Sequence, residues 1–430
     1  MDLDALDRLP SPAGRRVAVR VTREAARQLR AGHPWLFASS VRSVSHDGEP
    51  GDLAVVFDPD RELVAVGLYD PASMLRVRVL HHGSPRTVDV AFWHEHAVAA
   101  LARRSGVVGP GTDGFRAVHG ESDGFGGLVA DVYAGTLVLK VYSDAWTVRL
   151  ASVVPALVDA VASATSHPVE RVVVRCSRDL AARPHSRFAL AGLRDGVALA
   201  GALPDGPVLF HENGLVFEAD VVHGQKTGHF LDQRDNRARV RDLVRDRIRR
   251  DGRAEVLDVF CCTGGFSVYA AAGGATSVHS VDLAPGAIAT TRRNMAHNRD
   301  RREVAACRHH TTTGDAFTVL ADLADRGARF DVVVIDPPSF ASKQADVARA
   351  CRAYARLTRL GLAVVGPDGV LVQSSCSSRV GADLFAETVL DAAASSGRRV
   401  RELDRTGHAA DHPVGFAEAA YLDTLFLAVR

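Results

Sequence analysis

The chain of 430 residues contains almost no lysine. Lysine occurs only at positions 140, 226 and 343, although lysine and arginine together number 52, so the basic side chains are nearly all arginine. With 51 acidic residues the formal net charge is +1, so net charge alone does not indicate a nucleic-acid binder, while local basic patches remain compatible with one. A GC-rich genome explains a general replacement of lysine by arginine. The three lysines that remain therefore merit attention, because the two side chains differ in shape and hydration.

Metal-binding cysteine pairs and targeting segments are also missing. None of the six cysteines forms a C-x-x-C pair, which argues against a zinc site, and we expect no metal. The first 14 residues are polar and acidic, unlike a signal peptide. The chain lacks an uninterrupted apolar run of about 18 residues, so we expect no membrane-spanning segment. These absences predict a cytoplasmic protein with reduced thiols.

The sequence pattern changes twice along the chain and predicts three domains. Residues 15–85 read as short strands with one helix, separated by Asp, Pro and Gly turns. Residues 86–215 mix an amphipathic helix, a hairpin, a second helix and a strand, as in an α+β domain. From residue 216 onward, apolar strands alternate with longer helices, which indicates an α/β domain with a parallel, doubly wound sheet.

In such a sheet, ligands bind beyond the carboxyl ends of the strands, so the residues after each strand matter most. The first turn, Asp258 to Phe266, lacks the G-x-G-x-x-G pattern because Phe260 and Cys262 stand where its first two glycines would be. A turn that holds a dinucleotide pyrophosphate is therefore disfavoured. Gly264 and Gly265 still allow a ligand to approach the backbone at the start of a helix.

Acidic residues follow the next strands in order. Asp282 ends the second strand about 20 residues past the turn, where a carboxylate can accept both ribose hydroxyls. Asp315 follows the third turn and could accept the adenine amino group, and Asp336 ends the fourth strand before two prolines. Cys376 lies at the tip of the fifth strand. A nucleoside without a pyrophosphate suits this set, which is what S-adenosylmethionine offers.

Taken singly, each of these residues has a simpler reading. An acid at a strand end is often a cap or a loop residue, and Cys261 and Cys262 suit small core positions under the turn. The ordered combination of a T-G-G turn, an acid, G-D-A, D-P-P-x-F and a strand ending in S-C is far more specific than its members.

These motifs resemble a known family. Residues 216–430 resemble the Rossmann-like class I S-adenosylmethionine-dependent methyltransferases that act on cytosine C5 of bacterial 23S ribosomal RNA, the RlmI-like family. The segment GHPWLFASSV resembles its N-terminal RNA-binding PUA domain, and FRAVHGESDGFGGLVADVY resembles its central domain. The segments GQKTGHFLDQRDNR and AADHPV resemble further parts of it. The resemblance implies a cofactor site formed by Lys226, Thr227, Phe230, Asp232, Gly264, Asp282 and Asp315, supported by Gln233 and Arg234.

The resemblance also implies covalent catalysis, in which a thiolate attacks C6 of cytosine and activates C5 for methylation. Cys376 is the expected nucleophile, with Ser374, Ser375 and Ser377 beside it as hydrogen-bond donors. Asp336 is expected to hold the base edge. The expected substrate contacts come from Pro337, Phe340, Lys343 and His412, with Phe340 stacked on a flipped base. Many cytosine-C5 RNA methyltransferases have Pro-Cys where this chain has Pro337-Pro338, so only the later cysteine can serve.

Other functions stay open at this point. Related enzymes methylate guanine, at N7 or N2, without a covalent intermediate, and a non-catalytic PUA-containing RNA-binding factor is a further alternative. A dehydrogenase is disfavoured by the missing glycines. The expected partner is 23S ribosomal RNA or a precursor of the large subunit. The sequence does not identify the methylated nucleotide and atom, decide between naked RNA and an assembled subunit, or establish whether the chain forms a homodimer.

Overall fold

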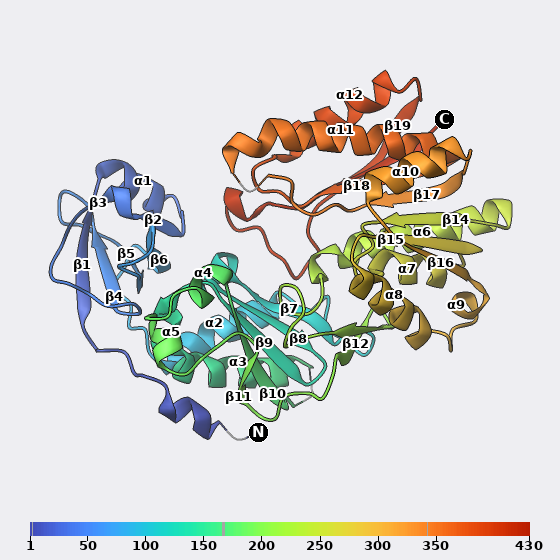
Figure 1. Ribbon diagram of the computed structural model, residues 1–430. Helices are drawn as coiled ribbons and strands as arrows, with labels where there is room; N and C mark the ends of the chain where they lie inside the picture. The colour runs from blue at the N-terminus through green and yellow to red at the C-terminus, as the bar shows by residue number, and fades with distance from the viewer. Residues whose placement is uncertain (2, 166–167, 342) are drawn as a thin grey trace. The chain divides into compact units, whose positions relative to one another are not determined.

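The computed structural model describes residues 1, 3–165, 168–341 and 343–430 (Figure 1). The chain divides into two compact units. The first contains Met1–Gly214, Glu218–Leu231 and Ala410–Phe416, and the second contains Leu215–Phe217, Asp232–Ala409 and Ala417–Arg430. The three domain ranges expected from the sequence stay predictions.

The first unit begins with a six-stranded sheet in the order β2-β6-β5-β4-β1-β3. In β1, Val17, Val19 and Val21 alternate with more exposed residues, so one face of this strand is buried. Thr22 caps the following helix by accepting a hydrogen bond from the Ala25 amide. The elements here are η1 (Asp4–Arg8), β1 (Arg16–Val21), α1 (Arg23–Arg30), β2 (Trp35–Phe37), η2 (Ala38–Ser40), β3 (Val41–Val44), β4 (Leu53–Phe57), β5 (Leu63–Tyr69) and β6 (Leu75–His82).

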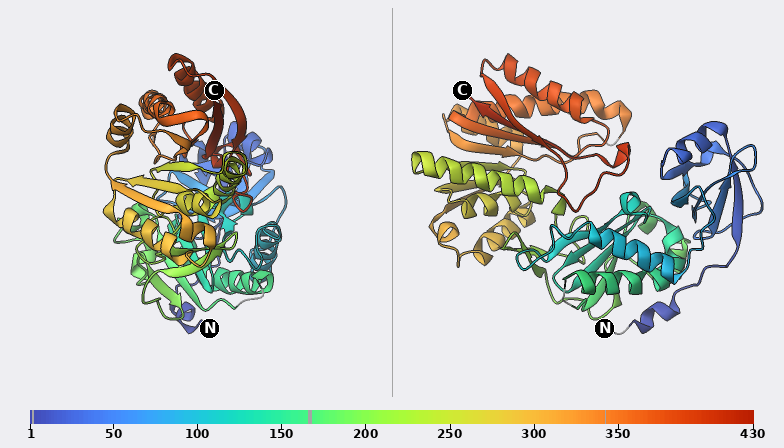
Figure 2. Two further views of the ribbon diagram at one scale, coloured as in Figure 1. Left: turned by 90° about the vertical axis from the view of Figure 1, so that its right-hand side faces the viewer. Right: turned by 180° about the vertical axis from the view of Figure 1, so that it is seen from behind.

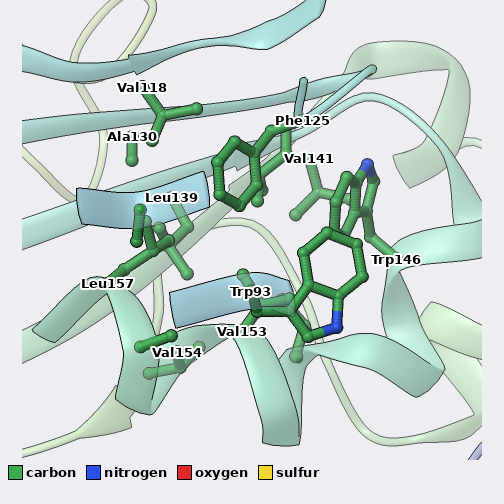
Figure 3. Close-up of a cluster of buried hydrophobic side chains, with 14 of the residues drawn as sticks. Trp93, Val118, Phe125, Ala130, Leu139, Val141, Trp146, Val153, Val154 and Leu157 are labelled. Atoms are coloured by element: carbon green, nitrogen blue, oxygen red, sulfur yellow. The ribbon is translucent and has the colours of Figure 1, made fainter. Parts of the chain in front are cut away.

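A five-stranded sheet in the order β11-β10-β9-β8-β7 forms the rest of the first unit's core, with α2 and α3 packed against each other. Trp93 meets Phe125 and Trp146 there, with ring centroids 5.8 and 5.4 Å apart (Figure 3). The elements are α2 (Val90–Ala102), β7 (Gly114–His119), η3 (Gly120–Asp123), β8 (Leu128–Tyr133), β9 (Thr136–Val141), η4 (Asp144–Arg149), α3 (Leu150–Thr165), β10 (Arg171–Cys176), α4 (Arg178–Ala181), α5 (Arg187–Leu190), β11 (Val197–Ala200) and β12 (Val208–Glu212). The next strand, β13 (Leu215–Ala219), begins in the second unit and ends in the first.

One helical stretch, Asp144–Thr165, is long and apolar enough to cross a membrane by length and composition alone. The sequence did not lead us to expect this, because charged residues interrupt its apolar run. The most apolar 18-residue window of this stretch is 56% buried, and Val153, Val154 and Leu157 pack into the core shown in Figure 3. A helix buried in a protein core passes the same test, so this feature is weak support for a membrane span.

The second unit contains a seven-stranded sheet in the order β16-β15-β14-β17-β18-β20-β19. Its first five strands are parallel, and β20 is antiparallel to both of its neighbours. The strands are β14 (Glu255–Val259), β15 (Ser277–Asp282), β16 (Arg308–Thr313), β17 (Phe330–Ile335), β18 (Val365–Ser375), β19 (Val400–Thr406) and β20 (Asp423–Val429). The predicted doubly wound parallel sheet is confirmed. The edge strand β16 was not predicted, because its sequence RHHTTT has no apolar run.

Helices cover both faces of this sheet, as Figures 1 and 2 show. On one face α11 packs beside α10 and α12, and on the other α7 packs beside α6, α8 and α9. Because the sheet is covered on both faces, its central strands contain continuous apolar runs, such as Val332–Ile335 in β17. The helices are α6 (Arg234–Asp251), α7 (Gly265–Ala272), α8 (Pro285–His297), α9 (Arg302–Ala306), α10 (Ala316–Asp325), α11 (Val347–Val364) and α12 (Ala382–Ser395), with short turns η5 (Leu231–Gln233), η6 (Gln344–Asp346) and η7 (Ala417–Ala419).

A late segment of the chain completes the first unit. Asp411 is fully buried there, and its carboxylate accepts a hydrogen bond from the Arg116 amide at 2.8 Å. The guanidinium of Arg104 donates to the Asp411 carbonyl oxygen at 3.0 Å and to the carboxylate of Asp123. The first unit therefore includes a segment, Ala410–Phe416, that follows its preceding segment, Glu218–Leu231, only after residues 232–409.

Candidate active site at the carboxyl ends of the strands

The turn after β14 has an unusual backbone. Phe260, Cys262 and Gly264 all have positive φ angles, of 63°, 50° and 78°. Residues with side chains rarely adopt this conformation, and where they do the strain often marks a functional site. In the sequence, Phe260 and Cys262 occupy the positions of the first two glycines of a G-x-G-x-x-G turn. The structure shows that both residues adopt a glycine-like backbone in spite of their side chains.

Helix α8 holds this turn in place. Thr291 donates to the Cys262 carbonyl oxygen at 3.0 Å, and Asn294 donates to that of Thr263 at 2.8 Å. A Cβ atom on Gly264 would lie 2.5 Å from the methyl group of Thr291. Glycine is therefore required at this position for two reasons, the left-handed backbone and the close approach of α8.

Asp282, at the end of β15, lies beside the turn. One carboxylate oxygen accepts the Cys262 amide at 2.9 Å, and the other accepts the Ala284 amide at 2.9 Å. Burial, and then the charge of Asp282, raises the pKa of Cys262 to about 11. Burial also raises the pKa of Cys261 well above its usual value, so neither thiol is a thiolate at neutral pH.

Asp258 lies under the turn in β14 and is fully buried. Its carboxylate accepts a hydrogen bond from Ser267 at 2.6 Å. Burial nevertheless raises the pKa of Asp258 to about 6, because the desolvation of the charge outweighs that bond. Asp315, by contrast, is exposed and caps α10 by accepting the Thr318 amide at 3.0 Å. Asp315 is thus a helix cap, which is the simpler of the two roles that its position allowed. Its hydrogen bond to the adenine amino group stays a prediction.

Asp336, directly after β17, is oriented by a buried network of amides and hydroxyls. Gln233 donates to its Oδ1 atom at 2.9 Å. The other end of the Gln233 amide accepts from Asn236 at 2.6 Å, and Asn236 in turn contacts Thr406 and Thr424. Gln233 was identified from the sequence, whereas Asn236, Thr406 and Thr424 were not. The spacing of Gln233 and Asn236, three residues apart on one helical face, was the available signal.

Cys376 lies immediately after β18, and its thiol contacts the Pro337 carbonyl oxygen at 3.3 Å. This contact brings the cysteine to the turn that carries Asp336. The expectation that the flanking serines donate hydrogen bonds to Cys376 is wrong. Their hydroxyls bond elsewhere, Ser374 to Thr424, Ser375 to Tyr354 and Ser377 to the Ala341 carbonyl oxygen.

The predicted base-contacting residues lie along the same turn. Pro337 is buried, and the partly exposed Phe340 lies 5.2 Å from Tyr354 between ring centroids. Stacking of Phe340 on a base would have to share or replace this contact. Lys343 is exposed, and its backbone amide donates to Asp346 at 3.3 Å. These substrate roles stay predictions.

The remaining predicted cofactor residues are divided between the two units. Asp232 belongs to the second unit, is buried, and accepts from the Tyr421 hydroxyl at 2.8 Å. Lys226 and Phe230 belong to the first unit, with the ammonium 4.4 Å from the ring centroid. Thr227 is buried there and donates to Asp131 at 2.5 Å.

His412, a predicted substrate contact, also belongs to the first unit and is buried. Its Nδ1 atom lies 2.9 Å from Asp411, and its ring centroid lies 5.2 Å from that of His119. The second unit alone therefore brings together Asp232, Gly264, Asp282, Asp315, Asp336 and Cys376, close to the carboxyl ends of its parallel strands.

This edge fits S-adenosylmethionine. The Asp282 carboxylate at the end of β15 lies beside the turn and can accept ribose hydroxyls. Within the described residues, no group of three or more His, Cys, Asp or Glu side chains is placed to hold a metal ion.

Comparisons with known proteins agree with this geometry. The profile of an S-adenosylmethionine-dependent methyltransferase family matches residues 201–423, and that of a PUA-like domain matches residues 19–82. The chain is 45% identical over 423 residues to "Ribosomal RNA large subunit methyltransferase" of Deinococcus radiodurans, covering 97% of this chain and 98% of that protein. It is 34% identical over 404 residues to "Ribosomal RNA large subunit methyltransferase I" of Shewanella frigidimarina, covering 93% and 96%.

Solved structures share the fold. A Streptococcus mutans protein described as an S-adenosylmethionine-dependent methyltransferase superposes with a TM-score of 0.76 at 20% identity, covering 96% of this chain and 100% of that one. A methyltransferase complexed with SAH gives 0.77 at 19% identity with the same coverage. The second unit is accordingly a class I methyltransferase fold, and the cofactor is S-adenosylmethionine. The chain belongs to the family of S-adenosylmethionine-dependent ribosomal RNA large subunit methyltransferases.

Proposed function

We propose that this protein methylates C5 of a cytosine in 23S ribosomal RNA through a covalent bond between Cys376 and C6 of the base. The contact between the Cys376 thiol and the Pro337 carbonyl oxygen carries the proposal, because it sets a cysteine beside the Asp336 turn. The names of the relatives support ribosomal RNA of the large subunit as the substrate. The PUA-like domain adds support, since such modules bind RNA.

The chemistry assigns a task to each residue. The Cys376 thiolate adds to C6, and the electron pair of the C5–C6 double bond becomes available at C5. When bound, S-adenosylmethionine supplies an electrophilic methyl group. After C5 has accepted that group from the sulfonium, which leaves as a neutral thioether, transfer of the C5 proton to water restores the C5–C6 double bond and expels the Cys376 thiolate. Asp336, held by Gln233, is positioned to bind the base edge while charge develops on the ring.

The Cys261 and Cys262 thiols are poor alternatives as nucleophiles. Burial and nearby carboxylates raise the pKa of both, so almost none of either is ionised at neutral pH. Cys376 is also the cysteine that directly follows a parallel strand at the same edge of the sheet as Asp282 and Asp336.

Substitution of the nucleophile tests the proposal. We expect Cys376→Ala to abolish turnover on large-subunit RNA while S-adenosylmethionine still binds in calorimetry. Cys351→Ala in α11 is the matched control, and we expect it to retain activity. RNA that carries 5-fluorocytosine should trap a covalent complex with the wild-type protein, which survives denaturing electrophoresis and is absent from Cys376→Ala.

Nucleoside mass spectrometry of the methylated RNA separates the alternatives. Methylcytosine supports the proposal, whereas methylguanine with an active Cys376→Ala variant identifies a guanine methyltransferase without a covalent intermediate. Cofactor binding without turnover on any RNA would instead indicate a non-catalytic RNA-binding factor.

A further inference from the structure

A cavity in the second unit lies away from the candidate active site. It has a volume of about 350 Å³ and lies between α8, the region of α9 and the edge strand β16. Its lining includes Arg292, Arg299, Cys307, His309 and Thr311. His309 is the second residue of β16, whereas Asp282 and Asp336 lie at or just beyond the carboxyl ends of their strands. The methyl-transfer chemistry described above uses none of the cavity residues.

The positive charge of this cavity is not neutralised by carboxylates. Within the described residues, neither Arg292 nor Arg299 forms an ion pair, whereas Arg247 pairs with Asp331 in the same unit. Arg292 is anchored to the edge strand through Thr311 Oγ1, which lies 3.2 Å from its Nε atom and 2.5 Å from its Nη2 atom. A guanidinium group presents a planar fork of donors that matches the oxygens of a phosphate group.

A chain of hydrogen bonds connects His309 with the core of the sheet. Ser267 donates to the Asp258 carboxylate at 2.6 Å, its oxygen lies 2.6 Å from that of Ser280, and Ser280 lies 2.8 Å from His309 Nε2. With Asp258 ionised, the Ser267 proton is used, so Ser280 donates to Ser267 and accepts from Nε2–H of His309. The neutral ring therefore carries its proton on Nε2, and Nδ1 is left as an acceptor.

The surroundings of His309 suppress its charge as long as the cavity holds no anion. Burial, and then the fields of Arg292, His310, His279 and Arg299, lowers the pKa of His309 to about 4. Burial raises the pKa of Cys307 to about 11, so its thiol contributes no negative charge at neutral pH. The cavity residues of α9, Val304 and Ala305, are uncharged. An anion beside the ring would reverse the balance and favour protonation at Nδ1.

We propose that this cavity is a phosphate-binding site, in which Arg292 and Arg299 bind the anion's oxygens and His309 gains a proton at Nδ1 as the anion binds. The phosphate group can come from the backbone of an RNA or from free phosphate. An RNA backbone would dock to the edge of the sheet, which adds a contact to the methyltransferase unit. Only this choice of source rests on the proposed function, because the affinity for an anion does not depend on methyl transfer.

Sulfate is the probe for the site, since it keeps both negative charges across the neutral pH range. We expect wild-type protein to bind sulfate in calorimetry with a dissociation constant on the order of 1 mM. The double variant Arg292→Gln, Arg299→Gln should bind it at least about 10-fold more weakly. Arg249→Gln, an exposed arginine of α6 paired with Asp246, is the matched control and should bind like wild type. Unchanged S-adenosylmethionine binding confirms that each variant is folded.

The pH dependence tests the role of His309. Wild-type affinity for sulfate should rise as the pH falls from about 7 to about 5, with proton uptake that calorimetry detects in buffers of different ionisation enthalpy. His309→Gln keeps a donor toward Ser280 but cannot take up the proton. Asp258, with a pKa of about 6, titrates over this range in both proteins, so the role of His309 is read from the difference between them, and the rise in affinity should be smaller in His309→Gln.

A single-stranded RNA oligonucleotide distinguishes the two sources of phosphate. A backbone source predicts that the double variant binds RNA more weakly, with a smaller dependence of affinity on salt concentration by about 1 to 2 ion contacts. Unchanged RNA binding, combined with lost sulfate binding, would assign the site to free phosphate. Equal sulfate affinity in the wild-type protein and the double variant, or no sulfate binding by the wild-type protein, would overturn the proposal.

Discussion

The Gln233 amide helps to orient the Asp336 carboxylate. Gln233 cannot turn its donor away from Asp336 without losing the bond that its oxygen accepts from Asn236. Asn236 is itself fixed by Thr406 and Thr424. Because all members of this network are buried or partly buried, their hydrogen bonds are costly to break and define one arrangement.

Gln233→Leu keeps most of the side-chain volume and removes both hydrogen bonds. We expect kcat to fall by roughly 10- to 100-fold, because a misplaced Asp336 no longer meets the base, with the S-adenosylmethionine dissociation constant within about 3-fold of wild type. Steady-state kinetics and calorimetry check this. A parallel loss of cofactor affinity and thermal stability, with kcat intact in the folded fraction, would show that Gln233 acts on folding alone.

Asp258 predicts a dependence of stability on pH. Its pKa is raised from 3.8 to about 6 in the folded protein, so the folded state binds more protons than the unfolded state between these values. The free energy of unfolding therefore falls as pH rises through that range, by about 3 kcal/mol. His309 acts in the opposite direction, because its pKa is lowered on folding.

Comparison with Asp258→Asn isolates the Asp258 contribution, since His309 is present in both proteins. We expect the stability of the variant relative to wild type to increase by about 3 kcal/mol as pH rises from about 4 to about 7, measured by urea unfolding. A difference that stays constant with pH would contradict the raised pKa of Asp258.

The sequence identified the residues that follow apolar strands and missed those held by long-range contacts. Asp282, Asp336 and Cys376 were predictable because each ends or directly follows a strand that the pattern reveals. The pairing of Asn236 with Thr406 and Thr424 joins positions about 170 and 190 residues apart, and no periodicity indicates such a contact. The serines beside Cys376 were misassigned because proximity in sequence does not fix where a hydroxyl points.

The turn between β14 and α7 combines strained backbone with close packing against α8. Its three positive φ angles fall on alternate residues, and Thr291 and Asn294 of α8 bond to two of its carbonyl groups. A comparison of substitutions at two glycines can separate the effect of backbone strain from that of packing. Gly264 and Gly252 have similar φ angles of 78° and 72°, but only a Cβ atom at Gly264 would meet a neighbour, Thr291, at 2.5 Å.

Gly252→Ala should therefore cost about 1 kcal/mol of stability from backbone strain alone. Gly264→Ala should cost about 1–3 kcal/mol more, because α8 must also move, and it should weaken S-adenosylmethionine binding. Urea unfolding and calorimetry measure both effects. Equal destabilisation by the two substitutions would show that contact with Thr291 does not constrain the turn.

Elements with strong hydrophobic periodicity were predicted well. The strand β17 has a long apolar pattern and lies where the sequence placed the fourth strand, directly before Asp336. The strand β16 was missed because an edge strand need not bury its residues, and polar side chains there hinder pairing with other chains. The cavity beside β16 was missed with it.

The whole chain folds into two compact units that do not follow the sequence order. The sequence pattern suggested successive domains, because composition changes locally and gives no sign that a late segment returns to an early one. Asp411 illustrates this return, since its carboxylate accepts the amide of Arg116 from the first part of the chain.

Asp411→Ala should destabilise the first unit although it lies near the end of the chain. We expect a loss of about 3 kcal/mol, because the buried Arg116 amide loses its acceptor. Hydrogen–deuterium exchange should increase in β7 and β8 and change little in β14 to β18. Asp383→Ala removes an exposed carboxylate that pairs with Arg405, so exchange in that control should match wild type. Faster exchange confined to the second unit would contradict this assignment.

The return of residues 410–416 has a consequence during translation. Ribosomes add about 5–20 residues per second, so these residues follow Gly214 by roughly 10 to 40 seconds. Until they leave the exit tunnel, the nascent first unit lacks the carboxylate that closes its core beside Arg116. Most of the second unit is synthesised in that interval. The last stage of folding of the first unit therefore waits for residues 410–416, and premature termination before residue 410 would leave both units incomplete.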